Sequence, residues 1–312
     1  MYDVNNIRKD FPILSRKINN KQLVYLDNGS SAQKPQVVID AVSKAYSEDY
    51  SNVHRGLHTL SNISTDKYEA VRGKIQKFLG AEHAEEIIFN SGATEGINTV
   101  SYSWGAPNLQ AGDEIILSIM EHHANIIPWH FLRERQGVII KWVDVDKDGN
   151  FDTQSVIDAI TPKTKLIAIT QMSNVLGTVV DVKEICKFAR RNNIATLIDG
   201  SQSSVHMPID VKDIGCDFFV ITGHKLYGPS SSGALYARKE RHDEMINFMG
   251  GGDMIKIVEK DLVTYNVSPH RFEAGTPGIV QMIGLGAAID YMNHIGTENI
   301  AKHETSLRDY AN

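Results

Sequence analysis

The sequence predicts an α/β protein whose central sheet is mostly parallel. Short apolar runs of strand length alternate with longer segments whose apolar residues recur at helical spacing, and turn-forming residues separate them. With 312 residues, 42% of them hydrophobic, the chain can bury a large core. We expect seven strands, at residues 86–89, 114–117, 138–143, 165–170, 195–198, 217–221 and 234–237. Helical spacing predicts helices at residues 63–79, 125–135, 182–191, 280–294 and 299–312.

Composition excludes several classes of function. The formal net charge is -6 and the basic residues are scattered, so neither a nucleic acid nor an anionic membrane is an expected partner. No apolar segment approaches membrane-spanning length and residues 1–10 lack the apolar core of a signal peptide, so we expect a cytoplasmic protein. Cys186 and Cys216 match no metal-ligand spacing, and no metal site is predicted.

The most informative residue is Lys225, which follows the predicted buried strand at 217–221. In an open α/β sheet, the carboxyl ends of the strands form the edge where ligands bind. A lysine that is desolvated there loses part of its proton affinity and can attack a carbonyl carbon. A solvated loop lysine is the alternative, and it is the commoner situation for lysine in general.

A glycine-bearing turn, Ser91–Gly96, lies between the strand at 86–89 and a following helix. Unpaired backbone N–H groups and the hydroxyl of Thr94 could bind a phosphate there. The same pattern is also typical of an ordinary helix N-cap. By itself the turn therefore predicts only an anion site or a cap.

Two further groups follow predicted strands. Asp199 ends the strand at 195–198, where a buried carboxylate needs a partner such as a protonated pyridine nitrogen, unless it only caps a turn. His123 lies in a loop after the strand at 114–117, where an imidazole could lie on a planar cofactor or be merely solvated. An anion seat, a strand-end carboxylate and a strand-end lysine together are what pyridoxal 5'-phosphate requires.

With these motifs, the sequence resembles the class V aminotransferase superfamily of fold-type I pyridoxal phosphate enzymes, and most closely the SUF-type, group II cysteine desulfurases. The resemblance implies a three-layer large domain around the mostly parallel seven-stranded sheet. It predicts an N-terminal arm at 1–20, a large cofactor-binding domain at 21–294 and the start of a C-terminal domain at 295–312. The motifs that carry it are Tyr25–Asp27, Ser30–Pro35, Asn52–His58, Ala93–Asn98, Met120–Asn125, Ser173–Thr178, Asp199–Gln202, Gly223–Pro229 and Arg271–Pro277.

The resemblance also implies roles for individual residues. Lys225 would bind pyridoxal phosphate covalently and later move protons at the substrate carbon. His123 would stack on the ring, while Asp199 would pair with the pyridine nitrogen and Gln202 with the ring oxygen. Other residues would hold the phosphate, namely Thr94, Thr222, His224 and, from the second subunit of a homodimer, Thr276.

For the substrate, the resemblance implies that Asn174 contacts the carboxylate. His54 and Arg55 are similar to residues at the substrate entrance, although a solvated loop is the alternative for them. In the family, roughly ninety further residues form a C-terminal domain with the persulfide-forming cysteine, so this chain is expected to be a truncated form. Cys186 and Cys216 lie in apolar segments and are expected to be inert packing residues.

The predicted function is that of a cysteine desulfurase for iron–sulfur cluster assembly, which converts L-cysteine to L-alanine and passes sulfur to an acceptor as a persulfide. The expected partners are the substrate, a second copy of the chain and a persulfide-accepting SUF protein. Selenocysteine lyase, with L-selenocysteine as substrate, and another class V aminotransferase-like activity are alternatives. A non-catalytic partner that binds pyridoxal phosphate or dimerises is a third.

Overall fold

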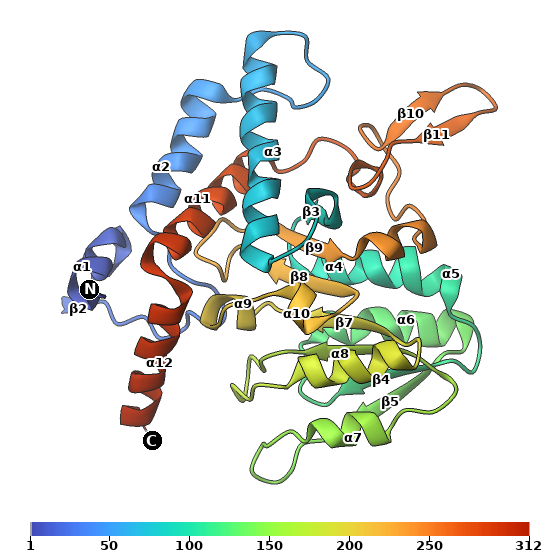
Figure 1. Ribbon diagram of the computed structural model, residues 1–312. Coiled ribbons are helices and arrows are strands. Elements are labelled where there is room, and N and C mark those ends of the chain that lie inside the picture. Colours follow the sequence, from blue (N-terminus) through green and yellow to red (C-terminus); the bar gives the residue numbers. More distant parts are fainter. Residues whose placement is uncertain (1, 312) are drawn as a thin grey trace.

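The computed structural model describes residues 2–311, and a seven-stranded sheet lies at its centre (Figure 1). The strand order is β3-β9-β8-β7-β6-β4-β5. Neighbouring strands pair in parallel except β9, which is antiparallel to both β3 and β8. The mostly parallel sheet is therefore confirmed. The strands are β3 (Ile87–Asn90), β4 (Glu114–Ser118), β5 (Ile139–Val143), β6 (Thr164–Thr170), β7 (Ala195–Asp199), β8 (Phe218–Thr222) and β9 (Gly233–Ala237).

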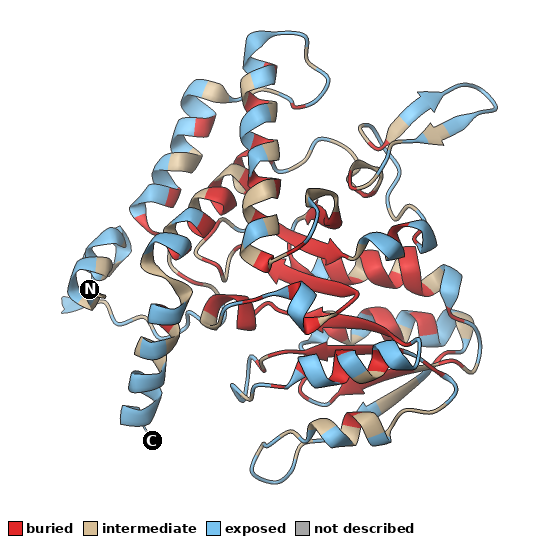
Figure 2. Ribbon diagram, viewed as in Figure 1, coloured by how far each residue is buried: buried red, intermediate tan, exposed pale blue. Residues whose placement is uncertain are grey.

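Both faces of the sheet are covered, which gives the three-layer arrangement that the sequence predicts. In β8, Phe219 and Ile221 belong to one buried apolar cluster, whereas Phe218 and Val220 belong to the other. Successive side chains of a strand point to opposite faces, so each face contributes to its own cluster. Figure 2 shows the central strands almost entirely buried. Strands buried on both faces have continuous apolar sequences, and for that reason the sequence located them well.

The predicted helices are α3 (Thr59–Leu79), α6 (Ile127–Gln136), α8 (Val182–Arg191), α11 (Ile279–Ile295) and α12 (Thr297–Ala311). In α8, Asp181 caps the first turn by accepting from the backbone N–H of Glu184, and the buried residues form one stripe. The α3 helix ends at Gly80, which has a φ of +68°. The helix expected at the glycine turn is α4 (Ala93–Thr99). Shorter helices that the sequence did not predict are α1 (Val4–Ile7), α2 (Gln36–Lys44), α5 (Ala106–Asn108), α7 (Thr153–Asp158), α9 (Ser203–His206) and α10 (Val211–Ile214).

Two hairpins lie outside the sheet and were not predicted. The larger, β10 (Ile255–Val258) with β11 (Val263–Tyr265), projects from the body of the molecule and is largely exposed (Figures 1 and 2). The smaller consists of β1 (Lys17–Ile18) and β2 (Lys21–Gln22). Exposed strands lack the buried apolar runs by which the central strands were recognised.

The segment at 295–312 is helical as far as the structure describes it, since α12 reaches Ala311 and Asn312 lies outside the described residues. Ile300 is buried, whereas Leu307 is exposed. The boundaries at 20 and 294 remain a prediction. No helix within residues 2–311 combines the length and the hydrophobicity that crossing a membrane requires.

Candidate active site

Six of the predicted site residues line one cavity of about 590 Å³, here called the cofactor cavity. It lies beyond the carboxyl ends of β3, β7 and β8, where ligands bind in open α/β sheets. The sheet thus brings together residues from separate βα units. The six are Thr94, Asn174, Asp199, Thr222, His224 and Lys225.

Lys225 follows β8 in a turn that is closed by backbone hydrogen bonds. Gly223 N–H donates to the Ser232 carbonyl at 2.7 Å, and a Cβ on Gly223 would lie only 2.1 Å from the Ser232 hydroxyl oxygen. The close approach of these two segments therefore needs a glycine. Burial lowers the pKa of Lys225, and the charge of Asp199 opposes part of that shift. A larger fraction of the amine is consequently neutral and nucleophilic.

Asp199 is buried, and its Oδ1 accepts from the backbone N–H of Ser201 at 2.9 Å. Among residues 2–311 it has no ion-pair partner within 4 Å. The buried hydroxyl of Ser201, which also lines the cavity, has no hydrogen-bond partner in the same part of the chain. A buried carboxylate with no cation beside it fits a ligand that brings a positive nitrogen, as a protonated pyridine does.

The glycine turn before α4 forms the other wall of the cavity. Gly92 has a φ of +138°, and a Cβ there would lie 3.0 Å from the Thr222 hydroxyl oxygen. The missing side chain keeps open a space bordered by the hydroxyl-bearing residues Thr94 and Thr222 and by His224. Space of this kind beside polar side chains fits a phosphate group.

Two charged residues near the cofactor cavity, Lys34 and Glu121, were not singled out from the sequence. Lys34 donates its ammonium to the His224 carbonyl at 3.1 Å, and burial lowers its pKa to about 8. Glu121 is buried behind the His123 turn, where it accepts from the Ser118 hydroxyl and from Asn125 Nδ2 at 2.7 Å. Burial raises the pKa of Glu121 to about 7. Both lie in quoted motifs, but only the tertiary contacts reveal what they touch.

Three predicted cofactor residues lie outside the cavity lining. The side chain of His123 is exposed, and the neighbouring His122 lines the cavity instead. Gln202 Nε2 donates to the Gly29 carbonyl at 2.8 Å, next to a different cavity that Lys225 also lines. Thr276 is exposed and lines yet another cavity, here called the second cavity.

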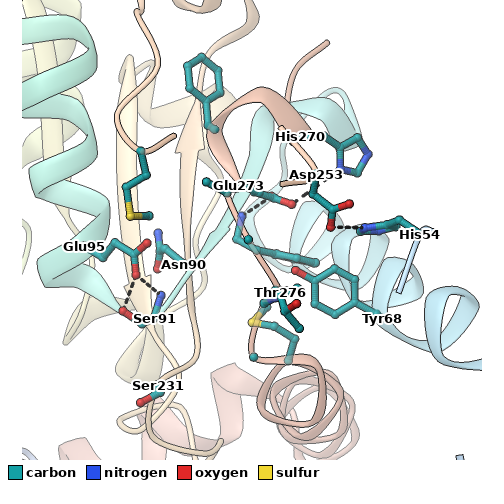
Figure 3. Close-up of a pocket in the computed structure, with 18 of the residues that line it drawn as sticks. His54, Tyr68, Asn90, Ser91, Glu95, Ser231, Asp253, His270, Glu273 and Thr276 are labelled. Carbon is teal, nitrogen blue, oxygen red and sulfur yellow. Dashed lines mark hydrogen bonds and ion pairs between the residues drawn. The ribbon is translucent and has the colours of Figure 1, made fainter. Parts of the chain in front are cut away.

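The second cavity has a volume of about 360 Å³ and shares Ser91 and Glu95 with the cofactor cavity (Figure 3). His54 lines it, whereas Arg55 does not. Arg55 Nε donates to Asp253 Oδ1 at 3.1 Å. Neither residue is therefore simply solvated, because both are tied to Asp253.

The two cysteines are buried, as predicted. Burial raises the pKa of the Cys186 thiol to about 12 and raises that of Cys216 as well. A thiol with a raised pKa and no solvent access is a poor nucleophile.

The strand-end lysine, the uncompensated carboxylate and the open polar space fit the aldehyde, ring nitrogen and phosphate of pyridoxal phosphate, so the fold and the site define a pyridoxal phosphate protein. The chain belongs to the class-V aminotransferase family, whose model matches residues 24–312. Pyridoxal phosphate is accordingly its cofactor.

Individual relatives agree with this assignment. A probable cysteine desulfurase of Xylella fastidiosa (strain 9a5c) is 48% identical, with 98% of this chain and 73% of the relative aligned. A cysteine desulfurase of Escherichia coli O7:K1 is 46% identical, over 99% of this chain and 77% of the relative. The structure of an apo cysteine desulfurase from Thermococcus onnurineus NA1 is similar with a TM-score of 0.93, at 34% identity, over 99% of this chain and 76% of that one.

Proposed function

We propose that this chain is a pyridoxal phosphate-dependent cysteine desulfurase, which takes sulfur from L-cysteine and leaves L-alanine. The observation that carries the proposal is the cofactor cavity, in which Lys225, Asp199 and Thr222 converge from neighbouring strand ends. Relatives with 46% and 48% identity that are named cysteine desulfurases support the choice of substrate.

When bound, pyridoxal phosphate supplies an aldehyde that condenses with amines and a ring that accepts electrons from the substrate carbon. Lys225 would hold that aldehyde through Nζ and later move a proton at the substrate carbon, which its lowered pKa favours. The Asp199 carboxylate would keep a proton on the ring nitrogen. These two side chains come from adjacent parallel strands, so the sheet fixes their spacing.

Further residues would bind and orient the cofactor and the substrate. The phosphate would be bound by Thr94, Thr222 and His224, and the substrate carboxylate by Asn174, which lies at the same cavity. His123 would cover the ring and Gln202 would bind the ring oxygen. For His123 we propose a rotation of its exposed side chain over the cavity when the cofactor binds.

We propose that the sulfur acceptor is a thiolate outside these 312 residues. Both cysteines are buried and their thiols have raised pKa values, which supports this proposal. A cysteine of another segment, or a persulfide-accepting protein of the SUF type, would take the sulfur. The unpaired state of both cysteines also fits a reducing compartment, so we propose a cytoplasmic location, with supply of sulfur for iron–sulfur clusters as the role.

We further propose a homodimer in which Thr276 of one copy reaches the phosphate in the other. Thr276 is exposed and lies outside the cofactor cavity of its own chain, which supports this arrangement. Residues 21–294 would form the cofactor-binding unit, with 1–20 as an arm and 295–312 as the start of a C-terminal domain. Sedimentation of the loaded protein tests the dimer, and a monomer with full cofactor affinity would contradict it.

The deciding experiment is an absorption spectrum with added pyridoxal phosphate, followed by borohydride reduction and peptide mapping. We expect a new visible band and a permanent adduct on Lys225. Lys225→Ala should lose both, whereas Lys187→Ala, a change at an exposed lysine of α8, should keep both.

The substrate is then tested by adding L-cysteine and a reductant, with a thiol acceptor supplied. Alanine and sulfide are the expected products. Turnover of selenocysteine alone, or formation of a keto acid, would replace the proposed activity by one of its alternatives. Cofactor binding without any of these products would contradict an enzymatic role.

A further inference from the structure

We propose that a site for a divalent first-row transition metal lies at the edge of the second cavity, with His54 and His270 of its lining and the adjacent Glu69 as ligands. One potential ligand atom from each of the three lies within 4.8 Å of the other two. Two imidazoles and one carboxylate are a typical ligand set for zinc, and they also suit iron and related metals. Nothing in the proposed desulfurase activity uses these three side chains as a metal site.

The ligands come from three separate elements, which the ion would join. His54 precedes α3, Glu69 lies on α3, and His270 begins a 3₁₀ turn at His270–Phe272. His54 Nε2 and Glu69 Oε1 are 2.9 Å apart, and the two imidazole centroids are 5.3 Å apart. Zinc bonds of about 2.0–2.2 Å require ligand atoms closer than 4.8 Å, so the three side chains would have to move closer together when the ion binds.

His54 is held in the orientation that metal ligation requires. Its Nδ1 lies 3.2 Å from Asp253 Oδ2, so the carboxylate fixes the ring (Figure 3). Nε2, on the other side of the ring, lies 2.9 Å from Glu69 Oε1. A carboxylate on the far nitrogen of a ligating histidine is the usual arrangement around zinc. Arg55 in turn binds the other oxygen of Asp253.

The backbone at both ends of this contact is strained. His54 and Asp253 have φ values of +67° and +68°, in the left-handed region that residues other than glycine seldom adopt. The backbone N–H of His54 donates to the Thr65 hydroxyl at 2.9 Å, which fixes that conformation. Strained residues of this kind gather at ligand-binding positions.

A buried hydroxyl in the same cavity lacks a partner. Tyr68 is fully buried and its ring centroid lies 5.7 Å from that of His54. Tyr68 lines the second cavity, and its buried hydroxyl finds no hydrogen-bond partner in the part of the chain that the structure describes. Three protein ligands leave one coordination position for water, and such a water could bond to this hydroxyl.

The charges around the site also favour a cation. Three carboxylates, on Glu69, Asp253 and Glu273, face two guanidinium groups, on Arg55 and Arg72. With neutral imidazoles the group therefore carries one excess negative charge, which attracts a divalent ion.

The competing explanation is a metal-free lock, that is, an ion-pair cluster in which a protonated His54 bridges Glu69 and Asp253 without any metal.

The test is a titration of chelator-treated protein with Zn²⁺, followed by calorimetry and by thermal unfolding. We expect one tight ion per chain, and we expect His270→Gln to weaken its binding by more than the roughly 10- to 100-fold that the loss of an outer-shell partner costs. His294→Gln removes an exposed histidine at the end of α11 and should leave the tight ion in place. Comparison of the two variants controls for nonspecific binding by other histidines, since the chain has twelve histidines in total.

Coordination is read independently with Co²⁺, whose visible bands report a low-coordinate site with nitrogen ligands. Loss of these bands in His270→Gln, or in Glu69→Gln if the first variant does not fold, would support the proposal. Equal zinc binding by the wild type, His270→Gln and Glu69→Gln would overturn it. Absence of tight binding in the wild type would also overturn it and leave the metal-free lock as the explanation.

Discussion

The cofactor cavity and the second cavity share Ser91 and Glu95 but are built in different ways. In the cofactor cavity, Asp199 and Lys225 lie at the ends of buried parallel strands, and Asp199 has no ion-pair partner in residues 2–311. Around the second cavity, in contrast, several charged groups already pair with one another. Glu273, for example, accepts from Arg72 Nη1 and from the backbone N–H of Phe89, both at 2.7 Å.

The two cavities therefore differ in what balances a buried carboxylate: within the described residues Asp199 has no cationic side chain paired with it, whereas Glu273 is paired with Arg72. A buried carboxylate without a partner costs folding free energy that a ligand can later recover. A satisfied network of ion pairs instead fastens α3 to β3 and to the segment at 270–276. Substitutions in the two cavities should therefore change different measurements.

The largest effect is expected for Asp199→Asn, which keeps the shape of the side chain but removes its charge. Cofactor-dependent activity should fall by about 10³-fold, because the charge that holds the ring nitrogen protonated is lost. The unloaded protein should be at least as stable as the wild type, since a buried charge has been removed.

Activity assays and thermal unfolding of the unloaded protein check this prediction. Asp66→Asn, a change at an exposed position of α3, is the control and should alter neither measurement. A large loss of stability in Asp199→Asn would show that the carboxylate supports the fold instead.

Arg72→Met should show the opposite pattern, in which the main effect is a loss of stability. Its buried guanidinium pairs with Glu69 and Glu273, donates to the Ile87 carbonyl and lies 4.0 Å above the Phe89 ring. Removing one member of a buried network costs about 3–5 kcal/mol, because the partner carboxylates remain buried without a counter-charge.

Denaturant unfolding measures that loss. Lys74, also on α3, forms an exposed ion pair with Asp290 of α11, and Lys74→Met should cost less than about 1 kcal/mol. Similar losses of unfolding free energy in Arg72→Met and Lys74→Met would mean that the buried ion pairs contribute no more to stability than the exposed one.

Glu121→Gln should change how stability depends on pH. The pKa of Glu121 is raised by burial from 4.5 to about 7, so between these values the folded state binds more protons than the unfolded state. Stability contributed by this group is therefore present at low pH and lost as the pH rises toward 7, by an amount on the order of 3 kcal/mol.

Unfolding free energies of the wild type and Glu121→Gln, measured from pH 5 to about 7.5, test the direction of this pH dependence. The wild type should lose stability relative to the variant as the pH rises. Parallel curves would show that Glu121 titrates at its ordinary pKa.

The smallest expected effect belongs to Thr65→Val. It removes the hydroxyl that accepts from the backbone N–H of His54, and the cost should be about 1 kcal/mol. Zinc affinity should fall with it, while cofactor binding stays unchanged. Thr65→Ser keeps the hydroxyl and should retain both stability and zinc affinity. If it did not, the hydrogen bond that fixes the strained His54 backbone would not be what supports zinc binding.

Much of the fold could be predicted from the sequence. Each of the seven strands of the sheet lies within one residue of its predicted range. For the strands buried on both faces the reason is that they must be continuously apolar, whereas the more exposed β5 was marked by its β-branched and aromatic residues. The candidate cofactor residues could also be named in advance, since Asp199 ends one such strand and Lys225 lies in the turn after another. Helices with a long buried stripe, such as α8, were predicted for the same reason.

Other features could not be predicted from the sequence. The β10–β11 hairpin is exposed, so no burial pattern marks it. The sequence did not distinguish His122 from His123 at the cavity, because the direction of each ring depends on the turn that Glu121 holds.

The sequence by itself determined the parallel sheet and the chemistry available at its strand ends, because both depend on neighbouring residues in the chain. Only the tertiary structure decided which charged groups pair beside the second cavity. Arg72 and Glu273 are 201 residues apart, and no local pattern relates them. They meet because α3 packs against α11 and β3, so their pairing is a consequence of how the layers pack.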